Sequence, residues 1–456
     1  MSAVRDVLVA AAAGVGFLGL VGAAEAVRRF TRASAEATRK LVHVSGGLAC
    51  VALPFLIESH WAVLGLALAL SGLFWIAHRR GRLKSVHGVE RTSRGVEYFP
   101  VVVYALFVLT RGRPWLYVCA LLTLAVSDAL AALIGTRYGR LRYEVDGESK
   151  SLEGSLAFLV ATFLVVELPL VLWNDPTLPS TASRVLAALL TAALVTGFEA
   201  VSLAGRDNLW VPLGTYFVLS KILRQPFGEI VAQNASLGAF ALAIGLIAAW
   251  TRTFNVGGAI LFVLWAYACW SLGSFDWALP VLTGFAVFLV LRPLAARAVR
   301  AKVHATLLSL LPSIVLLLVA NLALATRWSS LYDVLYGPFL AACVLILVQL
   351  AWNRLLLRWR FRGARRTQVA LALSLACTAL LALPAWRIQE DVAPSAPLAQ
   401  LAVGMAVGLV FDRFLGPDPS AAPHRRLRAH IGFTSGAALA ILLLQGVGLA
   451  GIWRPE

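Results

Sequence analysis

Residues 115–173 read WLYVCALLTLAVSDALAALIGTRYGRLRYEVDGESKSLEGSLAFLVATFLVVELPLVLW. Two apolar runs, near 115–135 and 154–173, enclose a short polar segment at 136–153. A helix that crosses a bilayer needs about 20 mostly apolar residues, and both runs meet that length. The stretch therefore predicts two membrane-spanning helices joined by a polar loop at the membrane surface.

The same pattern recurs outward in both directions along the 456 residues. The chain is 60% hydrophobic and 14% charged, whereas a soluble domain averages about 45–50% and 25%. We predict an all-α, polytopic integral membrane bundle of about 16 helices (14–16), and this composition excludes a soluble enzyme or a disulfide scaffold. The predicted spans lie near 4–27, 41–57, 60–78, 96–110, 115–135, 154–173, 184–204, 209–221, 235–250, 256–272, 276–294, 305–326, 331–352, 369–387, 398–415 and 432–453.

The formal net charge of +17 is explained by topology. More than three quarters of the 40 Lys and Arg fall in alternate loops between the predicted spans. Basic loops are retained on the cytoplasmic side, so we predict a cytoplasmic-membrane protein with these loops in the cytosol and both termini outside. The charge then requires no nucleic-acid partner, and it predicts attraction to anionic lipid headgroups.

Among the acidic residues of the predicted spans we single out two, Asp128 in LAVSDALAALIG and Glu199 in TGFEAVSLAG, whereas Glu167, Asp333 and Asp412 lie nearer the ends of their spans. A charged side chain at the bilayer centre costs at least about 2.5–3.5 kcal/mol, so such residues face a polar cavity or a partner. A pair that only stabilises the bundle, or a protonated carboxyl, explains either residue alone equally well. The polar segment that comes after Asp128 in the chain favours a functional site.

This polar loop ends in a lysine, hydroxyls and a glycine at the start of the next span. Free backbone N–H groups at a helix N-terminus bind phosphate, and glycine allows close approach. A polar loop with a helix cap at Ser151 is the alternative, and no P-loop motif is present. The residues that we predict to bind nucleotide phosphates here are Gly135, Gly139, Lys150, Ser151, Glu153, Gly154 and Ser155.

Asp207-Asn208 lies at the same predicted membrane face, eight residues after Glu199. Carboxylate and amide oxygens are hard ligands, so we predict Mg²⁺ bound by Asp128, Asp207 and Asn208, although a helix cap would also explain the Asp-Asn pair. Further polar residues share this face, which are Arg39, Lys40, His43, Arg91 and Arg94. We predict that the four Lys and Arg residues of this group steer a triphosphate.

Five segments occur in order along this part of the chain. They are RKLVHVSGG (39–47), RTSRGVEYFP (91–100), SDALAALIGTRYG (127–139), KSLEGSLAF (150–158) and FEAVSLAGRDNLWVP (198–212). Together they resemble the CTP-dependent lipid-alcohol kinases, which are dolichol kinase, phytol kinase and the CTP-dependent diacylglycerol kinase. This family is related to the phosphatidate cytidylyltransferases.

The resemblance covers about residues 36–222 and implies transfer of the CTP γ-phosphate to a membrane lipid hydroxyl with a divalent cation. CTP as donor rests on the resemblance alone. Phytol kinases often have Gly-Asp where this chain has Ser127-Asp128, so the resemblance does not select the acceptor alcohol. The residues that it implicates in the nucleotide and metal site are Asp128, Lys150, Ser151, Glu153, Gly154, Asp207 and Asn208.

We predict that a kinase module at 1–235 phosphorylates an isoprenoid alcohol such as phytol, a polyprenol or a dolichol-like lipid. Residues 236–456 form a second membrane module without a motif that indicates its role. Two alternatives remain open from sequence: a cytidylyltransferase that makes a CDP-lipid, and a lipid or solute transporter, which would place its charges at the membrane midplane. The residues expected to carry the chemistry are Asp128, Lys150, Glu199 and His43.

Overall fold

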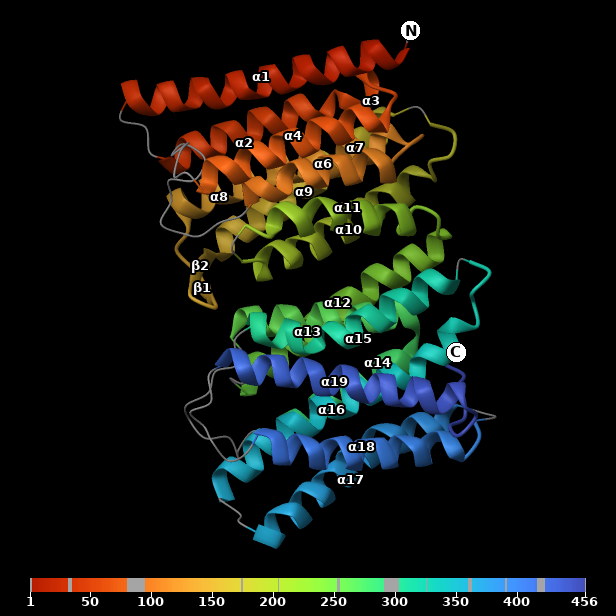
Figure 1. Ribbon diagram of the computed structural model, residues 1–456. Helices are drawn as coiled ribbons and strands as arrows, with labels where there is room; N and C mark the ends of the chain where they lie inside the picture. The colour runs from red at the N-terminus through yellow and green to blue at the C-terminus, as the bar shows by residue number, and fades with distance from the viewer. Residues whose placement is uncertain are drawn as a thin grey trace. The chain divides into compact units, whose positions relative to one another are not determined.

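The computed structural model divides the chain into two compact units (Figure 1). The first comprises Met1–Ala239 and Asn255–Ile260, and the second Phe240–Phe254 and Leu261–Glu456. The structure describes residues 2–31, 35–79, 95–173, 175–203, 205–251, 255–290, 303–324, 326–359, 363–389, 392–415 and 423–455.

The first unit is a bundle of long apolar helices whose cores are built almost entirely from Leu, Val, Ala and aromatic side chains. One core joins α1, α3, α4, α6 and α7, and a second joins α7, α9, α10 and α11. The helices are α1 (Ser2–Phe30), α2 (Ala35–Val51), α3 (Leu53–Leu56), α4 (His60–Arg79), α6 (Gly95–Leu109), α7 (Pro114–Leu122), η1 (Thr123–Ser127), α8 (Asp128–Tyr138), α9 (Leu152–Leu172), α10 (Thr181–Val201) and α11 (Asp207–Ile222). Helices α12 (Phe227–Thr251) and α13 (Val256–Ala268) each begin in this unit and end in the other.

A turn of π-helix, η1, interrupts the span that runs from α7 into α8. A π-turn inserts an extra residue into the helical hydrogen-bond ladder, and such turns are common at functional sites. Asp128 follows this turn directly and is only 9% exposed. The interruption therefore sets the direction in which the Asp128 carboxylate points.

The polar segment between α8 and α9 folds into a two-stranded antiparallel hairpin, β1 (Arg142–Val145) and β2 (Glu148–Ser151). Asp146 and Gly147 connect the strands, and both have positive φ, 51° and 94°. Two such residues in a two-residue loop make a type I′ turn, for which Asp-Gly is a preferred sequence. The pairing sets Lys150 opposite Tyr143, directly before the start of α9.

The second unit is a separate helical bundle with an aromatic core that contains Trp277, Tyr336, Phe339 and Trp453. A second π-turn continues α13 here, as η1 continues α7 in the first unit. Its further elements are η2 (Cys269–Gly273), α14 (Phe275–Val290), α15 (Val303–Leu324), α16 (Leu331–Trp359), α17 (Gly363–Ile388), α18 (Ser395–Leu415) and α19 (Pro423–Gly446).

The predicted polytopic helical fold is confirmed. Within the described residues, thirteen helices are long and apolar enough to cross a membrane, and the shorter apolar helices Glu97–Leu109 and Phe275–Val290 coincide with two more predicted spans. The remaining predicted span, 209–221, coincides with α11. The hairpin is the addition that the all-α prediction did not contain, since 136–153 was expected only to be a polar loop.

Close packing of α2 against η1 depends on Gly47. A methyl group at this position would lie 2.5 Å from Cβ of Ala125, which no relaxed structure tolerates. We expect Gly47→Ala to lower the free energy of unfolding by about 1–2 kcal/mol, because overpacking outweighs the better helix propensity of alanine. Thermal unfolding in detergent measures this, with Gly72→Ala in open space on α4 as the matched control. Equal unfolding temperatures for the two variants would contradict the expectation.

Candidate active site

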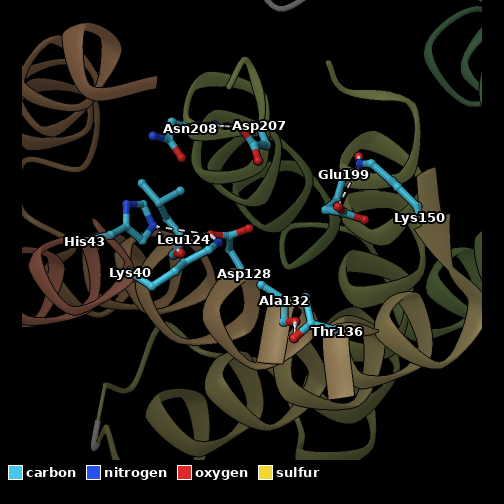
Figure 2. A network of polar contacts seen from close by, with 10 residues as sticks. All are labelled: Lys40, His43, Leu124, Asp128, Ala132, Thr136, Lys150, Glu199, Asp207 and Asn208. Atoms are coloured by element: carbon cyan, nitrogen blue, oxygen red, sulfur yellow. Dashed lines mark hydrogen bonds and ion pairs between the residues drawn. The ribbon is translucent and has the colours of Figure 1, made fainter. Parts of the chain in front are cut away.

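Polar side chains from five separate parts of the first unit line one cavity of about 250 Å³. They come from the start of α2, from α8, from the hairpin and the first turn of α9, from the end of α10, and from the start of α11. The lining residues are Arg39, Lys40, Asp128, Ala131, Ala132, Gly135, Thr136, Arg142, Glu148, Ser149, Lys150, Ser151, Gly154, Ser155, Glu199, Ser202, Gly205 and Asp207. Figure 2 shows the polar network around it.

On one side of the cavity, Lys40 of α2 forms an ion pair with Asp128 of α8. His43, one helical turn after Lys40, places Nε2 3.7 Å from the same carboxylate. The His43 ring is oriented by its Nε2, which donates to the carbonyl oxygen of Leu124 at 3.1 Å. The π-turn and the close packing at Gly47 thus bring a cation and an imidazole onto the carboxylate.

A second ion pair lies across the cavity, between Lys150 of β2 and Glu199 of α10 (Figure 2). Lys150 Nζ donates to Glu199 Oε1 at 2.7 Å and also to the backbone carbonyl of Glu199. Burial opposes the charge on Lys150, but the carboxylate of Glu199 more than offsets this, so the pKa of Lys150 is raised. Lys150 therefore stays protonated through neutral pH.

Asp207, the first residue of α11, lines the cavity, and its Oδ1 accepts the backbone N–H of Asn208 at 3.0 Å. In Figure 2 its carboxylate points toward Asp128. Asn208 is buried and does not line the cavity. The side chain of Asn208 is therefore a weaker candidate ligand than the two carboxylates.

The donor set fits one kind of metal site. No group of three or more His, Cys, Asp or Glu that could hold an ion by itself occurs in the part of the chain that the structure describes. Mg²⁺ is commonly held by one or two carboxylates together with substrate phosphates rather than by a complete protein cage. Asp128 and Asp207 on one cavity match that arrangement.

The predicted phosphate-binding residues divide between lining and supporting roles. Cβ atoms at Gly135 and Gly154 would each lie within 3.5 Å of the other helix, so these glycines allow α8 and α9 to touch. Ser151 caps α9, its Oγ accepting the Gly154 N–H at 3.1 Å. Ser155 shares a 2.7 Å hydrogen bond with the Tyr143 hydroxyl.

Two predicted phosphate-binding residues have structural contacts instead of a place on the cavity wall. The Glu153 carboxylate accepts the backbone N–H groups of Arg140 and Leu141, at 2.9 Å and 3.1 Å, which ties the hairpin to α9. Gly139 ends α8, and a Cβ there would lie 2.7 Å from the Ser151 side chain. Both residues hold the wall in place without lining it.

Of the predicted cations, Arg39 and Lys40 line the cavity, and Arg91 and Arg94 lie outside the described residues. Sequence reasoning missed Arg142, a cation of β1 on the cavity rim. The signal that could have found it is the Asp146-Gly147 turn, because a tight hairpin there returns the chain and pairs Arg142 with Ser151.

Fold and site together define an integral membrane protein that holds acids and lysines in one cavity among its spanning helices. The chain is 33% identical over 205 residues to a phytol kinase of Synechocystis sp., an alignment that covers 44% of this chain and 86% of the relative. It is 31% identical over 237 residues to a probable chloroplastic phytol kinase of Glycine max, covering 47% and 77%. The chain belongs to the lipid-alcohol kinase family.

A shorter match agrees with this assignment. Over 45 residues the chain is 51% identical to dolichol kinase of Saccharomyces cerevisiae, which is 10% of this chain and 8% of the relative. No family model matches the chain, and no solved structure matches it. The family resemblance inferred from the five ordered segments is confirmed by the two phytol kinase matches, which cover 44% and 47% of this chain.

Proposed function

We propose that this protein transfers the γ-phosphate of CTP to the hydroxyl of a membrane isoprenoid alcohol, with Mg²⁺, at the cytosolic face of the membrane. The observation that carries the proposal is that Asp128, Lys150 and Asp207, from three separate segments, line a single cavity. A donor triphosphate needs cations and metal-binding oxygens within its own length, and this cavity offers both.

In this proposal Asp128 and Asp207 hold the metal, and Asn208, which does not line the cavity, is the weaker candidate for a further oxygen ligand. Mg²⁺ supplies charge neutralisation at the phosphates, which together with positioning provides most of the catalysis in phosphoryl transfer. Glu199 lies across the cavity and is neutralised by Lys150. Glu199 is therefore better placed to order that lysine than to bind the metal.

The lysines are held in place before nucleotide binds. Lys40 is paired with Asp128, and Lys150 is paired with Glu199, so each half-buried cation has a defined position. The oxygens of a triphosphate can form charge-assisted hydrogen bonds with both lysines. Because the lysines are already in position, little free energy is spent on reorganising them when the nucleotide binds. We propose that Lys150, the N–H groups at the start of α9 and Arg39 bind the phosphates, and that Arg142 adds charge at the rim.

His43 is the proposed acceptor of the proton from the alcohol. Because its Nε2–H donates to the Leu124 carbonyl, the neutral ring keeps Nδ1 free to accept a proton. The neighbouring Asp128 carboxylate would stabilise the imidazolium that forms. Glu199, which could also accept that proton, already accepts two contacts from Lys150.

The isoprenoid acceptor is proposed from the relatives, whose names specify phytol and dolichol. All of the cavity residues belong to the first unit, so we propose that this unit is the kinase module and that the second unit has a separate role. The cytosolic orientation is proposed from the distribution of Lys and Arg among the loops.

A product assay tests the proposal. Purified protein in nanodiscs is incubated with radiolabelled CTP or ATP and with phytol, a polyprenol, dolichol or diacylglycerol. We expect CTP-dependent phosphorylation of an isoprenoid alcohol with release of CDP, abolished by EDTA and restored by Mg²⁺. Release of pyrophosphate with a CDP-lipid would identify a cytidylyltransferase instead, and phosphorylation from ATP alone would refute the donor assignment.

A further inference from the structure

A second cavity, of about 310 Å³, lies in the apolar part of the first unit. It is bounded by α1, α2, α3, α4 and α6, which adjoin one another in Figure 1. Its wall is almost entirely hydrocarbon, with the thiol of Cys50 as the exception. No part of this cavity is used by the phosphoryl-transfer chemistry described above.

Two features connect this cavity to the polar site. The Phe99 ring lines it, and the centroid of that ring lies 6.0 Å from the centroid of the His43 ring. Helix α2 supplies both sites: Lys40 lines the polar cavity and Ala49 lines the apolar one. Nine residues of helix separate the two positions by about 14 Å. The two sites thus share helix α2, and Phe99 of the apolar wall packs near His43, the residue that meets Asp128.

We propose that this apolar cavity binds the isoprene units nearest the hydroxyl of the acceptor alcohol. Phe99 would contact the tail next to the hydroxyl, which would lie near His43. The proposal rests on the kinase function proposed above and adds to it the location of the tail. A cavity of about 150 Å³ holds one benzene molecule, so 310 Å³ has room for roughly a dozen carbon atoms, or two to three isoprene units. The rest of a longer tail would extend into the bilayer.

The cavity would act through shape rather than through hydrophobic attraction. Lipid tails are as apolar as the side chains of spanning helices, so moving a tail from bilayer to cavity gains little free energy. What the cavity would provide is a fixed path along Phe99 toward His43, which would present the hydroxyl to the phosphate site, the positioning that catalysis requires. The enzyme would therefore discriminate among the first few units and be indifferent to those beyond.

Gly16 of α1 allows the cavity to be filled. It lines the cavity, and a Cβ added there meets no atom within 4 Å. Gly19, one turn further along the same helix, also has open space around it but does not line the cavity. Gly16→Phe and Gly19→Phe are therefore matched variants, since both replace an exposed glycine of α1 by the same residue.

The test compares phytol, geranylgeraniol and the short alcohol prenol as acceptors in nanodiscs. For Gly16→Phe we expect the KM of phytol and geranylgeraniol to rise about tenfold, because a filled cavity must be overpacked to admit a tail. The KM of CTP and the turnover of prenol should stay at their wild-type values. Gly16→Leu should give a smaller rise in the KM of phytol, and Gly19→Phe none.

Equal behaviour of Gly16→Phe and Gly19→Phe, with wild-type protein active on isoprenoid alcohols, would overturn the cavity assignment and leave the proposed function intact. Wild-type protein that phosphorylates no isoprenoid alcohol would overturn the function itself. A second measurement, on wild-type protein alone, uses geranylgeraniol that carries a diazirine on its second unit. Crosslinks to α1, α2, α4 or α6 support the assignment, and crosslinks found solely elsewhere overturn it.

Discussion

Asp128→Asn is expected to lower CTP-dependent phosphorylation of the lipid alcohol by about a thousandfold, within the range seen when one electrostatic contact to a transition state is lost. Asparagine has nearly the same shape, so the bundle should fold. The substitution removes the charge that pairs with Lys40 and that we assign to the metal. Turnover of phytol with saturating CTP and a series of Mg²⁺ concentrations measures the effect, and a raised Mg²⁺ requirement is expected with it.

Asp412→Asn is the matched control. Asp412 is buried in the second unit and paired with Arg366, its Oδ1 lying 2.6 Å from Nη2. The control therefore also removes a buried carboxylate from an ion pair within a helical bundle. We expect its turnover to remain at the wild-type value. Loss of turnover in both variants to the same degree would attribute the effect at Asp128 to folding, and near-normal turnover of Asp128→Asn would refute its assigned role.

Lys150→Ala is expected to have two separable effects. It leaves Glu199 buried without its cation, which should lower the free energy of unfolding by about 3 kcal/mol. It also removes a cation that we assign to the triphosphate, which should reduce turnover by about a hundredfold or more. Thermal unfolding in detergent reports the first effect, and phosphorylation at saturating phytol over a range of CTP concentrations reports the second.

The double variant Lys150→Ala/Glu199→Gln separates these effects. Neutral glutamine needs no cation, so we expect the stability to return while turnover stays low. Recovery of turnover in the double variant would show that Lys150 only neutralises Glu199. Because the pKa of Lys150 is raised, the stabilisation by the wild-type pair is present through neutral pH and is lost only as the pH rises past that pKa.

The transporter alternative gains no support from the arrangement of charges. It predicted charges at the membrane midplane, whereas Asp128 and Glu199 line one cavity together with residues of the hairpin that connects two spans. Similarity to phytol kinases over 44% and 47% of the chain then assigns it to an enzyme family. The product assay distinguishes a kinase from the cytidylyltransferase alternative.

Several features could be predicted from sequence because they depend on local composition. Apolar runs of about 20 residues specify spanning helices whatever surrounds them, since the backbone must satisfy its own hydrogen bonds in lipid. The acids within spans were recognisable as costly, and hence as candidates for a site. The hairpin was equally local, and the Asp146-Gly147 pair was an available signal that the prediction of a polar loop overlooked.

Only the tertiary structure decided which charges meet. Lys40 and Asp128 are 88 residues apart, and their pairing depends on a π-turn and on α2 packing closely at Gly47, neither of which has a signature in periodicity. The assignment of Lys150 to Glu199 and the apolar cavity lined by Phe99 were also invisible in sequence. Every span is rich in Leu, Val and Ala, so a run of these residues predicts that a helix crosses the membrane but does not identify the helices it packs against. Where neighbouring helices leave space is determined by how those helices pack against one another.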